Sequence, residues 1–435
     1  MAQKLALITG YAKDPEFVKV LLLALNNQTC RDFDCYVYAT PGCHYFLEDS
    51  FIDSLSFPCY HLRLQKNMGF AGNNNYAINT AFKNPDYEYA VLANDDTIPE
   101  NNWLEELLMT AQTGDKIGAV APKMVFYQKF VTVSGITSAL KKYDRLLGVR
   151  FYLNTGFAGS FYPKKFYKKG FFQQEEDEIY PFKWTSDNFT IELPFAAATN
   201  STDYMLRLFV ANNAAIKDQS LKIMIGDAMI ANIELQPNKL CYELTIPASI
   251  IEASAHYIVQ NAGGAVKDDN TYEIGFGEID KGQYDTPREV SLFCGGACIL
   301  NRKALMATGL FMDGLFSYYE DSDLSMRMQK KGFKILYHPK AVIKHYHTGT
   351  SKEWSPFFTY YAFRNKIIFS AKTFGMRAFA AAFFERSKET YTYGKLFAKS
   401  RFKNPDHRAR LKLNLVILKD ALIGIVKFKP KFLPK

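Results

Sequence analysis

Short apolar runs that alternate with helix-like segments are the feature that most limits how the first 126 residues can fold. The first three runs stop at Gly, Pro or Asn, as strands buried on both faces of a parallel sheet do. The four runs are residues 5–11, 35–40, 90–94 and 117–126. Apolar residues at helical spacing over 17–25, and a Thr97-x-x-Glu100 capping-box spacing, place helices between the runs. This order predicts an open α/β sheet.

Residues 160–278 have a different pattern. Short alternating segments recur at a spacing of roughly 8–12 residues, broken by Gly, Asn, Pro and Asp, and no helix-period run is found. This pattern predicts an antiparallel β-sandwich. The α/β pattern returns after residue 290, with an apolar run at 291–300 and another at 333–337. We therefore expect an α/β domain that is interrupted by an all-β insert.

Composition excludes several classes of protein. The 435 residues include 36 Phe and 27 Tyr, which excludes disorder for most of the chain. Seven Cys form no CxxC pair and leave an odd one, which argues against a disulfide framework and a zinc ribbon. We find no signal peptide, and no apolar stretch approaches the ~20 residues that span a bilayer. We expect a cytoplasmic protein, with peripheral attachment to a membrane as the alternative.

The basic character is concentrated at the C-terminal end. The whole chain has a net charge of +9, but residues 386–435 hold 14 Lys or Arg against 3 acidic residues, a net +11. The expected helical face contains Leu411, Leu415, Leu418 and Leu422, and Lys412 and Lys419 lie on another face. This tail could dock on an anionic membrane surface as an interfacial helix, or its leucines could pack on the protein. Nucleic acid is not an expected partner, since no recognised module accompanies the charge.

Two adjacent carboxylates follow the third apolar run. Asn94, Asp95 and Asp96 stand where ligands bind in open α/β sheets, outside the carboxyl end of a strand. Carboxylates there could hold a hard divalent cation, although the same residues are also ordinary turn chemistry before a helix. His345 ends a later apolar run and could complete such a site with Asp96, or could be structural.

Residues 67–75 are rich in Gly and Asn and precede a helical run. Small residues allow close backbone approach, and a helix N-terminus favours an anionic or polar ligand. The glycine spacing does not match a dinucleotide-binding motif. An Asn-capped helix start is the alternative interpretation.

Three carboxylates, Glu320, Asp321 and Asp323, lie within four residues at a predicted helix start. Interaction with the helix dipole is worth about 0.3–1 kcal/mol, which explains one acid but not three. Crowded carboxylates repel one another and have raised pKa values, a property that suits a general base.

Taken in order, these segments resemble the family 2 glycosyltransferases of GT-A fold, and among them the rhamnosyltransferase-like group. The motifs are at Asn67–Asn75, Asn94–Asp96, Trp103–Leu107, Gly118–Lys123, Asp280–Val290, Gly296–Leu300, Phe316–Leu324, Gly332–His345 and Tyr360–Asn365. They cover about residues 1–158 and 279–370. Each motif alone is weak to moderate, whereas the ordered set is highly specific.

The resemblance implies a domain organisation. A GT-A catalytic domain with a Rossmann-like open sheet would comprise residues 1–159 and 279–385. Residues 160–278 would form an inserted β-sandwich that resembles a jelly-roll carbohydrate-binding module, with a dimerisation or spacer domain as the alternative. Residues 386–435 would form a basic amphipathic helical tail.

The resemblance also implies an activity and residue roles. The protein would transfer a sugar, with inversion, from a nucleotide-diphosphate sugar to a hydroxyl of a glycan or lipid-linked glycan in surface polysaccharide synthesis. Asp96 and His345 would hold Mg²⁺ or Mn²⁺ at the diphosphate. Asp321 would deprotonate the acceptor, with Glu320 and Asp323 next in line. The implied donor-binding residues are Thr9, Asn67, Gly69, Phe70, Asn75, Asn94, Asp95 and Arg364.

The sequence departs from the family pattern at two places. Asn94 stands where the first Asp of the triplet is frequent. The family's V-D-N-x-S at the second strand is replaced by residues 37–42, Val-Tyr-Ala-Thr-Pro-Gly, which leaves the choice between UDP- and dTDP-linked donors open.

Other function classes are weighed against this one. A catalytically inactive glycan-binding or scaffold protein on the same fold would be expected to lack one of the key acids or the histidine, and none is missing. A nucleotidyltransferase would need a Gly-rich basic loop near the N-terminus, and a processive polymerase would show Q-x-x-R-W; the sequence offers little of the first and nothing of the second.

Overall fold

The computed structural model describes residues 4–137, 147–153, 166–176, 181–195, 203–211, 220–236, 241–346 and 355–433. The chain folds into two compact units. Unit 1 comprises Met1–Tyr127, Gln260–Phe276 and Gly282–Lys435, and unit 2 comprises Gln128–Val259 and Gly277–Lys281. The chain therefore returns to unit 1 for a short excursion, residues 260–276, before it passes through unit 2 a second time.

Unit 1 is built on a mixed sheet in which six strands have the order β6-β20-β4-β1-β2-β3. The strands of unit 1 described here are β1 (Lys4–Tyr11), β2 (Phe33–Ala39), β3 (Cys59–Arg63), β4 (Tyr87–Ala93), β5 (Thr97–Pro99), β6 (Ile117–Phe126), β19 (Arg288–Val290), β20 (Ala297–Asn301) and β21 (Lys334–His345). β1 is parallel to β2 and β4, and β2 is parallel to β3. β20 runs antiparallel between β4 and β6, whereas β21 is parallel to β6. The expected open α/β sheet is confirmed.

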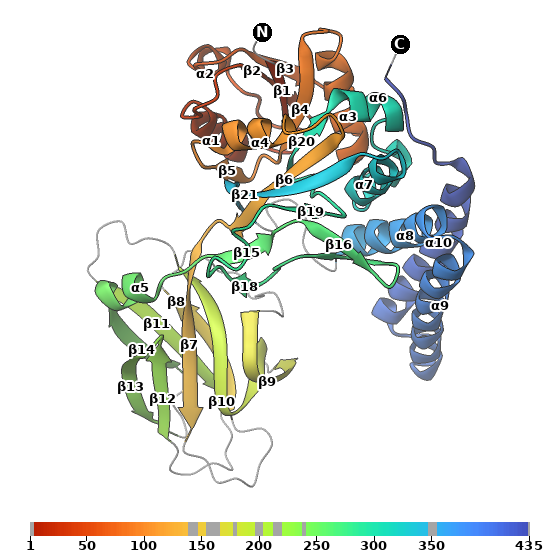
Figure 1. Ribbon diagram of the computed structural model, residues 1–435. Coiled ribbons are helices and arrows are strands. Elements are labelled where there is room, and N and C mark those ends of the chain that lie inside the picture. The colour runs from red at the N-terminus through yellow and green to blue at the C-terminus, as the bar shows by residue number, and fades with distance from the viewer. Residues whose placement is uncertain are drawn as a thin grey trace. The chain divides into compact units, whose positions relative to one another are not determined.

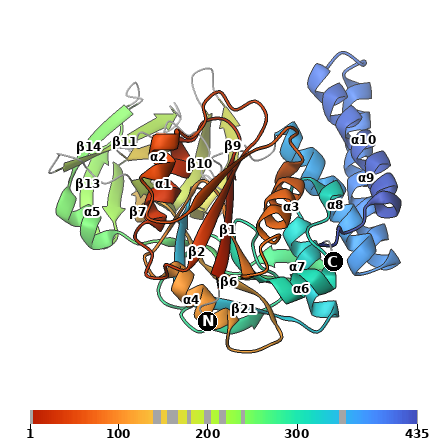
Figure 2. The ribbon, with the colours of Figure 1, turned by 90° about the horizontal axis from the view of Figure 1, so that it is seen from above.

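Helices cover both faces of this sheet. They are α1 (Glu16–Leu25), α2 (Asp49–Asp53), α3 (Gly69–Ala81), α4 (Trp103–Ala111), α6 (Arg302–Thr308) and α7 (Glu320–Lys330). α1 and α4 lie on one side of the central strands, and α3, α6 and α7 lie on the other (Figures 1 and 2). Because both faces are covered, consecutive residues Leu5 to Ile8 of β1 are all fully buried. The carboxyl ends of β1, β2 and β4 meet at one edge of the sheet.

The excursion of residues 260–276 contains the end of β15 (Ile258–Asn261) and a hairpin of β16 (Gly264–Lys267) and β17 (Asn270–Glu273). The hairpin is anchored to the segment that precedes β20, because the backbone N–H of Gly264 donates to the carbonyl of Leu292 at 2.8 Å. The excursion therefore lies beside the edge at which the motif residues gather.

Unit 2 contains an eight-stranded antiparallel sheet of order β13-β12-β7-β10-β8-β11-β14, with β9 paired to β10. Its elements are β7 (Lys129–Thr137), β8 (Leu147–Leu153), β9 (Tyr167–Glu176), β10 (Pro181–Phe195), β11 (Asp203–Ala211), β12 (Ser220–Ile225), β13 (Ala228–Glu234), β14 (Cys241–Pro247), α5 (Ala248–Ser254) and β18 (Glu278–Ile279), which pairs with β15. β13 and β14 stand at opposite ends of the order yet contact each other, so the sheet curls around its apolar core. The region is antiparallel as expected, but one curled sheet takes the place of two stacked sheets.

The structural boundaries of the insert differ from the predicted 160–278. Unit 2 begins at Gln128 because Val131 and Val133 of β7 lie in its core and β8 pairs with β10 and β11. The Gly-rich segment 154–159, at the predicted boundary, lies outside the described residues. At the other end, the excursion 260–276 belongs to unit 1.

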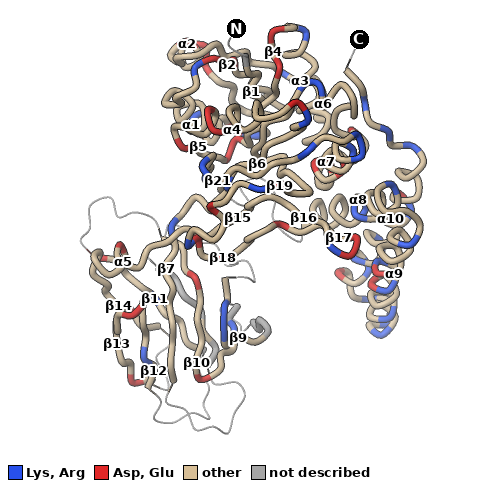
Figure 3. Tube along the Cα trace, in the orientation of Figure 1, with Lys and Arg blue, Asp and Glu red and all other residues tan. Residues whose placement is uncertain are grey.

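Three helices form the C-terminal part of the chain: α8 (Pro356–Thr373), α9 (Met376–Lys399) and α10 (Pro405–Lys427). They pack on one another around Ile367, Ile368, Ala382, Ile417 and Ala421. The predicted boundary at residue 386 falls inside α9, because α9 is continuous from Met376. Basic residues are spread along these helices (Figure 3). None of the described helices is long and apolar enough to cross a membrane.

Of the four leucines predicted to share a face of α10, Leu411 and Leu418 are half-buried, whereas Leu415 and Leu422 are exposed. The face that α10 buries contains Asn414, Ile417, Ala421 and Gly424. The small residue Gly424 lets α10 approach α8 so closely that a Cβ there would collide with Ile368. Leu415 and Leu422 lie outside this face and are 53% and 47% exposed. Close backbone packing, rather than leucine content, decides which face is turned inward.

Candidate active site

Asn94, Asp95 and Asp96 form the turn that follows β4, at the edge where β1 and β2 also end. Thr97 closes this turn, because its backbone N–H and its hydroxyl donate to the carbonyl of Asn94 at 3.2 and 2.6 Å. The Asp96 side chain is buried, whereas Asn94 and Asp95 are half-buried. Ligand-accessible polar groups are thus held at the strand end where open α/β sheets bind ligands.

The structure brings the two predicted metal ligands together from positions 249 residues apart. β5 pairs with the end of β21, so that Thr97 lies opposite His345. The backbone N–H of Tyr346 also donates to the carbonyl of Asp96 at 2.8 Å. Asp96 Oδ1 and His345 Nε2 are 3.1 Å apart, and both side chains are largely buried.

This pair fits a divalent cation that a bound molecule also coordinates. Among the residues that the structure describes, no group of three or more His, Cys, Asp and Glu could hold a metal by itself. Mg²⁺ is commonly bound by one or two carboxylates together with substrate phosphates. Carboxylates suit both Mg²⁺ and Mn²⁺, and imidazole is a ligand of several divalent transition metals. Neighbouring ligands of an octahedral ion at about 2.1 Å lie about 3.0 Å apart. The separation of Asp96 and His345 matches that spacing.

Asp95 is half-buried beside the carboxylate of Asp96. Burial, followed by the neighbouring charge of Asp96, raises the pKa of Asp95 to about 7. Burial and then the Asp95 charge raise the pKa of the Tyr38 hydroxyl, while a hydrogen bond with Asn74 lowers it. The Tyr38 ring occupies the space that a side chain at Gly10 would need. A cation bound beside Asp96 would relieve the repulsion between the two aspartates.

Thr9 lies near the end of β1 and is 1% exposed. Within the described parts of the chain its hydroxyl has no hydrogen-bond partner. A buried polar group without a partner costs about 1–3 kcal/mol, which a ligand or water at this position would offset. Thr9 thus lies near the predicted donor site with its hydroxyl buried.

The start of α3 is shaped by Asn67 and Gly69. Asn67 Oδ1 accepts hydrogen bonds from the Gly69 N–H at 2.9 Å and from Asn73 Nδ2 at 3.2 Å. Gly69 has a φ of +73°, and a Cβ there would collide with the carbonyl of Phe316. The Phe70 ring contacts Phe311 edge-to-face with ring centroids 6.0 Å apart. These contacts hold α3 against the segment that precedes α7, the helix that begins with Glu320 and Asp321.

Two residues that the sequence predicts to bind the donor, Asn75 and Arg364, make structural contacts instead. Asn75 donates to the Phe311 carbonyl at 2.8 Å and to Asp313, and it accepts from the Phe311 N–H at 3.1 Å. Arg364 is 6% exposed and donates to the carbonyls of Gly314 and Leu315, both at 2.9 Å. Their polar atoms are used to hold segment 311–315, so neither presents a group to a ligand.

The three acids at the start of α7 have different surroundings. Asp323 is buried and paired with Arg327 at 2.8 Å, which makes it structural in place of the predicted catalytic role. Glu320 is 6% exposed, and its Oε2 has no partner among the described residues. Asp321 is half-buried and accepts from the backbone N–H groups of Gly295 at 3.0 Å and Ser322 at 2.6 Å.

The pKa values of these acids follow from burial. Desolvation raises the pKa of Asp321 above its usual range, while hydrogen bonds from Gly295 and Ser322 oppose the shift. Burial, and then the charge of Asp321, raises the pKa of Glu320 well above its ordinary value. Asp321 alone combines partial exposure with donors that fix its orientation, so it has the geometry of a general base.

Segment 294–296 contacts both acidic regions of the site, the turn after β4 and the start of α7. The Asn94 N–H donates to the Gly296 carbonyl at 2.8 Å, and the neighbouring Gly295 N–H donates to Asp321 Oδ2 at 3.0 Å. A Cβ on Gly295 would be crowded by Phe70 and Asp321. The turn after β4 and the start of α7 therefore contact adjacent glycines, which places the metal-ligand turn and the acid cluster at one site.

The backbone before the acid cluster is strained. Phe316, Tyr318 and Tyr319 have φ values of 67°, 71° and 69°, a region that non-glycine residues avoid. Asn365 holds this segment, because its Nδ2 donates to the carbonyls of Leu315, Ser317 and Tyr318 at 2.8–2.9 Å. Strain of about 1–3 kcal/mol per residue persists where the surrounding structure enforces it, and it is frequent at functional sites.

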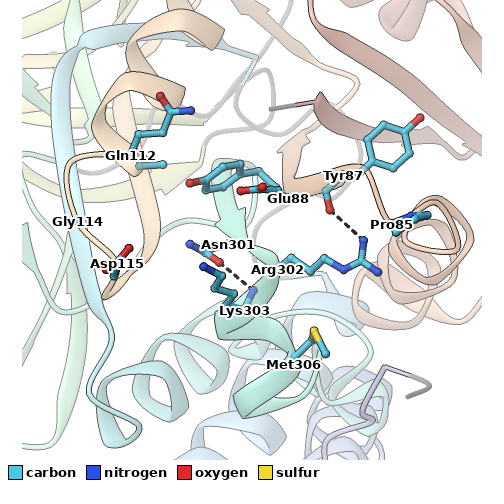
Figure 4. Close-up of a pocket in the computed structure, with 12 residues that line it drawn as sticks. Pro85, Tyr87, Glu88, Gln112, Gly114, Asp115, Asn301, Arg302, Lys303 and Met306 are labelled. Carbon is cyan, nitrogen blue, oxygen red and sulfur yellow. Dashed lines mark hydrogen bonds between the residues drawn. The ribbon is translucent and has the colours of Figure 1, made fainter. Parts of the chain in front are cut away.

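A separate pocket of about 260 Å³ opens at the start of β4, the end away from Asn94 (Figure 4). Its lining includes Tyr87, Asp115 and Arg302. The Arg302 guanidinium donates to the backbone carbonyls of Phe82, Asn84 and Tyr87 at 2.9–3.0 Å, so its charge is used inside the protein. The lining of this pocket includes none of Asp96, Asp321 and His345.

Sequence reasoning missed three residues of this site. Gln260 was assigned to the insert, yet it lies in unit 1 and contacts His345. Gly295 could have been found from the sequence, because two consecutive glycines precede an apolar run there. Asn365 is the last residue of the Tyr360–Asn365 motif, of which only Arg364 is predicted to bind the donor. No sequence signal marks Gln260, since only the tertiary fold brings it to the site.

No protein-family model matches the sequence, and no curated protein is significantly similar to it. Among solved structures, the chain is similar to GalNAc-T7 with UDP, GalNAc and Mn²⁺, at 9% identity and a TM-score of 0.46. The alignment covers 98% of this chain and 59% of that one. The chain thus spans less than two thirds of GalNAc-T7.

Two further solved structures are similar. One is the mannosyltransferase PcManGT of Pyrobaculum calidifontis in complex with GDP-Man and Mn²⁺, at 9% identity, a TM-score of 0.39, and coverage of 98% of this chain and 87% of that one. The other is residues 1–349 of S. aureus TarS, at 15% identity, a TM-score of 0.24, and coverage of 39% and 40%. At these values the likeness says nothing about substrate or mechanism.

Proposed function

We propose that this protein is a metal-dependent glycosyltransferase of GT-A type. It transfers a sugar from a nucleotide-diphosphate sugar to a hydroxyl of a glycan or lipid-linked glycan, with inversion, in cytoplasmic steps of surface polysaccharide synthesis. The observation that carries this proposal is the segment 294–296, which joins the turn of Asp96 to the carboxylate of Asp321. A base beside a cation site is the combination that such a transfer needs.

Asp321 acts as the general base. It takes the proton of the acceptor hydroxyl while that oxygen attacks the anomeric carbon of the donor. The bond from this carbon to the phosphate oxygen breaks, and the nucleoside diphosphate leaves with the electron pair. The Gly295 and Ser322 N–H groups orient the carboxylate, and its raised pKa makes it a stronger base than an exposed aspartate. One displacement inverts the configuration without a covalent enzyme intermediate.

The donor lies at the edge where β1 and β4 end. Asp96 and His345 would hold the cation, and Asp95 and Asn94 lie on the same turn as Asp96. Bound Mg²⁺ or Mn²⁺ supplies positive charge that stabilises the diphosphate leaving group. Thr9, near the end of β1, is proposed as a further donor contact. The nucleotide of the donor is UDP or dTDP in this proposal.

The alternative is a catalytically inactive, glycan-binding or scaffold protein on the same fold. Three observations favour the enzyme: the buried Glu320 oxygen without a described partner, the raised pKa of Asp321, and the strained backbone of Phe316–Tyr319. Each costs stability, and a scaffold gains nothing from it.

Unit 2 is proposed to bind part of the glycan acceptor, with a spacer or dimerisation module as the alternative. The insert can evolve and be exchanged as a module, because its entry and exit are adjacent. Phe130 and His256 exchange both backbone hydrogen bonds, at 2.8 and 3.0 Å.

The C-terminal helices are proposed to dock on an anionic membrane. The exposed strip of α10, defined here as Leu415, Val416, Leu422, Ile423 and Val426, is 39–76% exposed. The exposed Lys412, Lys419 and Lys427 accompany it. Apolar side chains flanked by lysines are the pattern of interfacial binding, and each Lys near anionic lipid contributes about 1 kcal/mol.

Co-sedimentation with anionic vesicles tests the membrane proposal. The full chain should pellet at low salt and be released at high salt. Changing Leu422 and Val426 to Ser should weaken sedimentation by about tenfold, since each removes apolar area that would be buried. As a control, Met306→Ser alters an exposed apolar side chain of α6, outside the strip. Equal sedimentation of all variants would show that the strip does not contact lipid.

Hydrolysis of a panel of sugar nucleotides, with and without glycan acceptors, tests the proposed activity. Chelation by EDTA should abolish the activity, addition of Mn²⁺ or Mg²⁺ should restore it, and Asp96→Ala should remove it. Activity that is unchanged in EDTA would contradict the metal-dependent mechanism. A folded protein that binds sugar nucleotide and transfers nothing to any acceptor would support the inactive alternative.

A further inference from the structure

Gln260 lies behind the proposed metal ligand His345. It is 5% exposed and stands at the point where the chain re-enters unit 1 after its long passage through unit 2. Gln260 Oε1 and His345 Nδ1 are 2.9 Å apart, and His345 Nε2 is 3.1 Å from Asp96 Oδ1. The three side chains form a line, amide to imidazole to carboxylate.

The direction of the first hydrogen bond determines which ring nitrogen can bind a cation. A neutral imidazole carries one N–H, and an oxygen that accepts from Nδ1 keeps the proton there. The lone pair of Nε2 is then free to bind a cation beside Asp96. Ligating histidines commonly donate their other N–H to a carboxylate or carbonyl oxygen, which fixes the ring and its tautomer.

The backbone around Gln260 is held on both sides. The Ala262 N–H donates to the Ile274 carbonyl at 2.9 Å, and Asn261 Oδ1 accepts from the Gly263 N–H at 2.7 Å. The Ala262 carbonyl also accepts from the Arg288 guanidinium at 2.7 Å. The amide of Gln260 is thus carried on a fixed segment, as a group that orients another side chain must be.

We propose that Gln260 is a positioning residue that sets the tautomer and the orientation of His345 for divalent-cation binding. The inference rests on the proposed metal-dependent function and deepens it. It also explains why residues 260–276 belong to unit 1: this segment places a buried amide oxygen beside the proposed metal ligand His345.

The test measures Mn²⁺ binding to the full chain by electron paramagnetic resonance in the presence of UDP or dTDP, without sugar donor or acceptor. Gln260→Leu, which keeps the bulk and loses the acceptor, should weaken Mn²⁺ binding by about 10–100-fold. Gln260→Glu keeps an acceptor oxygen and should bind Mn²⁺ at least as tightly as the original chain. In turnover assays, Gln260→Leu should need more Mn²⁺ for half-activation but reach a similar kcat at saturating Mn²⁺.

The matched control is Gln28→Leu. Gln28 is a fully buried amide of unit 1 that donates to the Glu100 carbonyl at 2.8 Å and accepts from the Leu104 N–H at 3.0 Å. It should lose stability without a change in Mn²⁺ affinity. The proposal is overturned if Gln260→Leu binds Mn²⁺ like the original chain, if Gln260→Glu fails as the Leu variant does, or if Gln28→Leu weakens binding equally.

These outcomes separate the inference from the proposed function. If Mn²⁺ binding to the original chain depends on both Asp96 and Gln260 but no sugar is transferred, the positioning role stands and the proposed activity falls. If transfer depends on Mn²⁺ and Asp96 but not on Gln260, the activity stands and the positioning role falls. An original chain that binds no Mn²⁺ in the presence of UDP or dTDP overturns both.

Discussion

The two units each bury acidic side chains, but they treat them differently. In unit 2, Glu192 is 1% exposed, and its carboxylate accepts from Thr132 at 3.1 Å and lies 2.8 Å from His256 Nε2. In unit 1, a Glu320 oxygen has no partner among the described residues, and Asp321 is only half-buried beside strained backbone. A buried acid is therefore not in itself a sign of function. A buried acid left without a compensating partner is the sign that distinguishes unit 1.

Asp321→Asn should have the largest effect on turnover, because it removes the proposed general base of unit 1. The substitution keeps the size of the side chain and removes its ability to accept a proton, so turnover should fall at least about 100-fold while sugar-nucleotide affinity stays within about threefold. Steady-state kinetics and calorimetric titration of the donor measure the two quantities. A loss of threefold or less would place the base elsewhere, with Glu320 the next candidate.

The pH profile gives a second measurement on the same residue. Because burial raises the pKa of Asp321, the acidic limb of kcat/KM should lie at higher pH than an ordinary aspartate gives, and the rate should rise with pH through that limb. The groups that face Asp321 are Glu320 and the Cys294 thiol. Because the Asp321 charge helps to raise the pKa of Glu320, Glu320 stays protonated while Asp321 titrates, so a Glu320→Gln variant should leave the limb in place. An unchanged profile in Asp321→Asn would contradict the assignment.

Glu192→Leu should show the opposite signature. It leaves the Thr132 hydroxyl and His256 without their buried acceptor, at a cost of about 1–3 kcal/mol in the stability of unit 2. Turnover on small acceptors should be unchanged, because the residue lies in the other unit. Thermal unfolding monitored by circular dichroism, together with the transfer assay, measures both. Loss of turnover in a folded Glu192→Leu variant would break the distinction between the units.

Excision of unit 2 should have the smallest effect on donor binding. Replacing Val131–Ala255 with a short Gly/Ser turn closes the chain between Phe130 and His256, which are already hydrogen-bonded, and keeps Gln260 in place. Such a loop closure costs little, so donor affinity should stay within about twofold. Use of glycan acceptors or product length should change. An insoluble product would show that unit 1 depends on unit 2 for folding.

Much of the fold was determined by the sequence. Apolar runs that stop at the sheet edge specify the strands of unit 1, because only strands covered on both faces bury consecutive residues such as Leu5 to Ile8. For α10, the leucine spacing left an inward orientation and a membrane-facing orientation equally open. Helix packing there follows the small residues Ala421 and Gly424 instead, and sequence periodicity does not report which partner helix is close.

The candidate site divides in the same way. The sequence alone predicted Asp96, His345 and Asp321 as site residues, since motifs at strand and helix ends carry those residue types. Only the tertiary structure showed that Asp323, Asn75 and Arg364 have their polar atoms occupied, because hydrogen-bond partners come from segments distant in sequence. Gln260 is the clearest case. A buried amide has no sequence signature, and it gains its role from the strand that returns it to the side of a histidine 85 residues away.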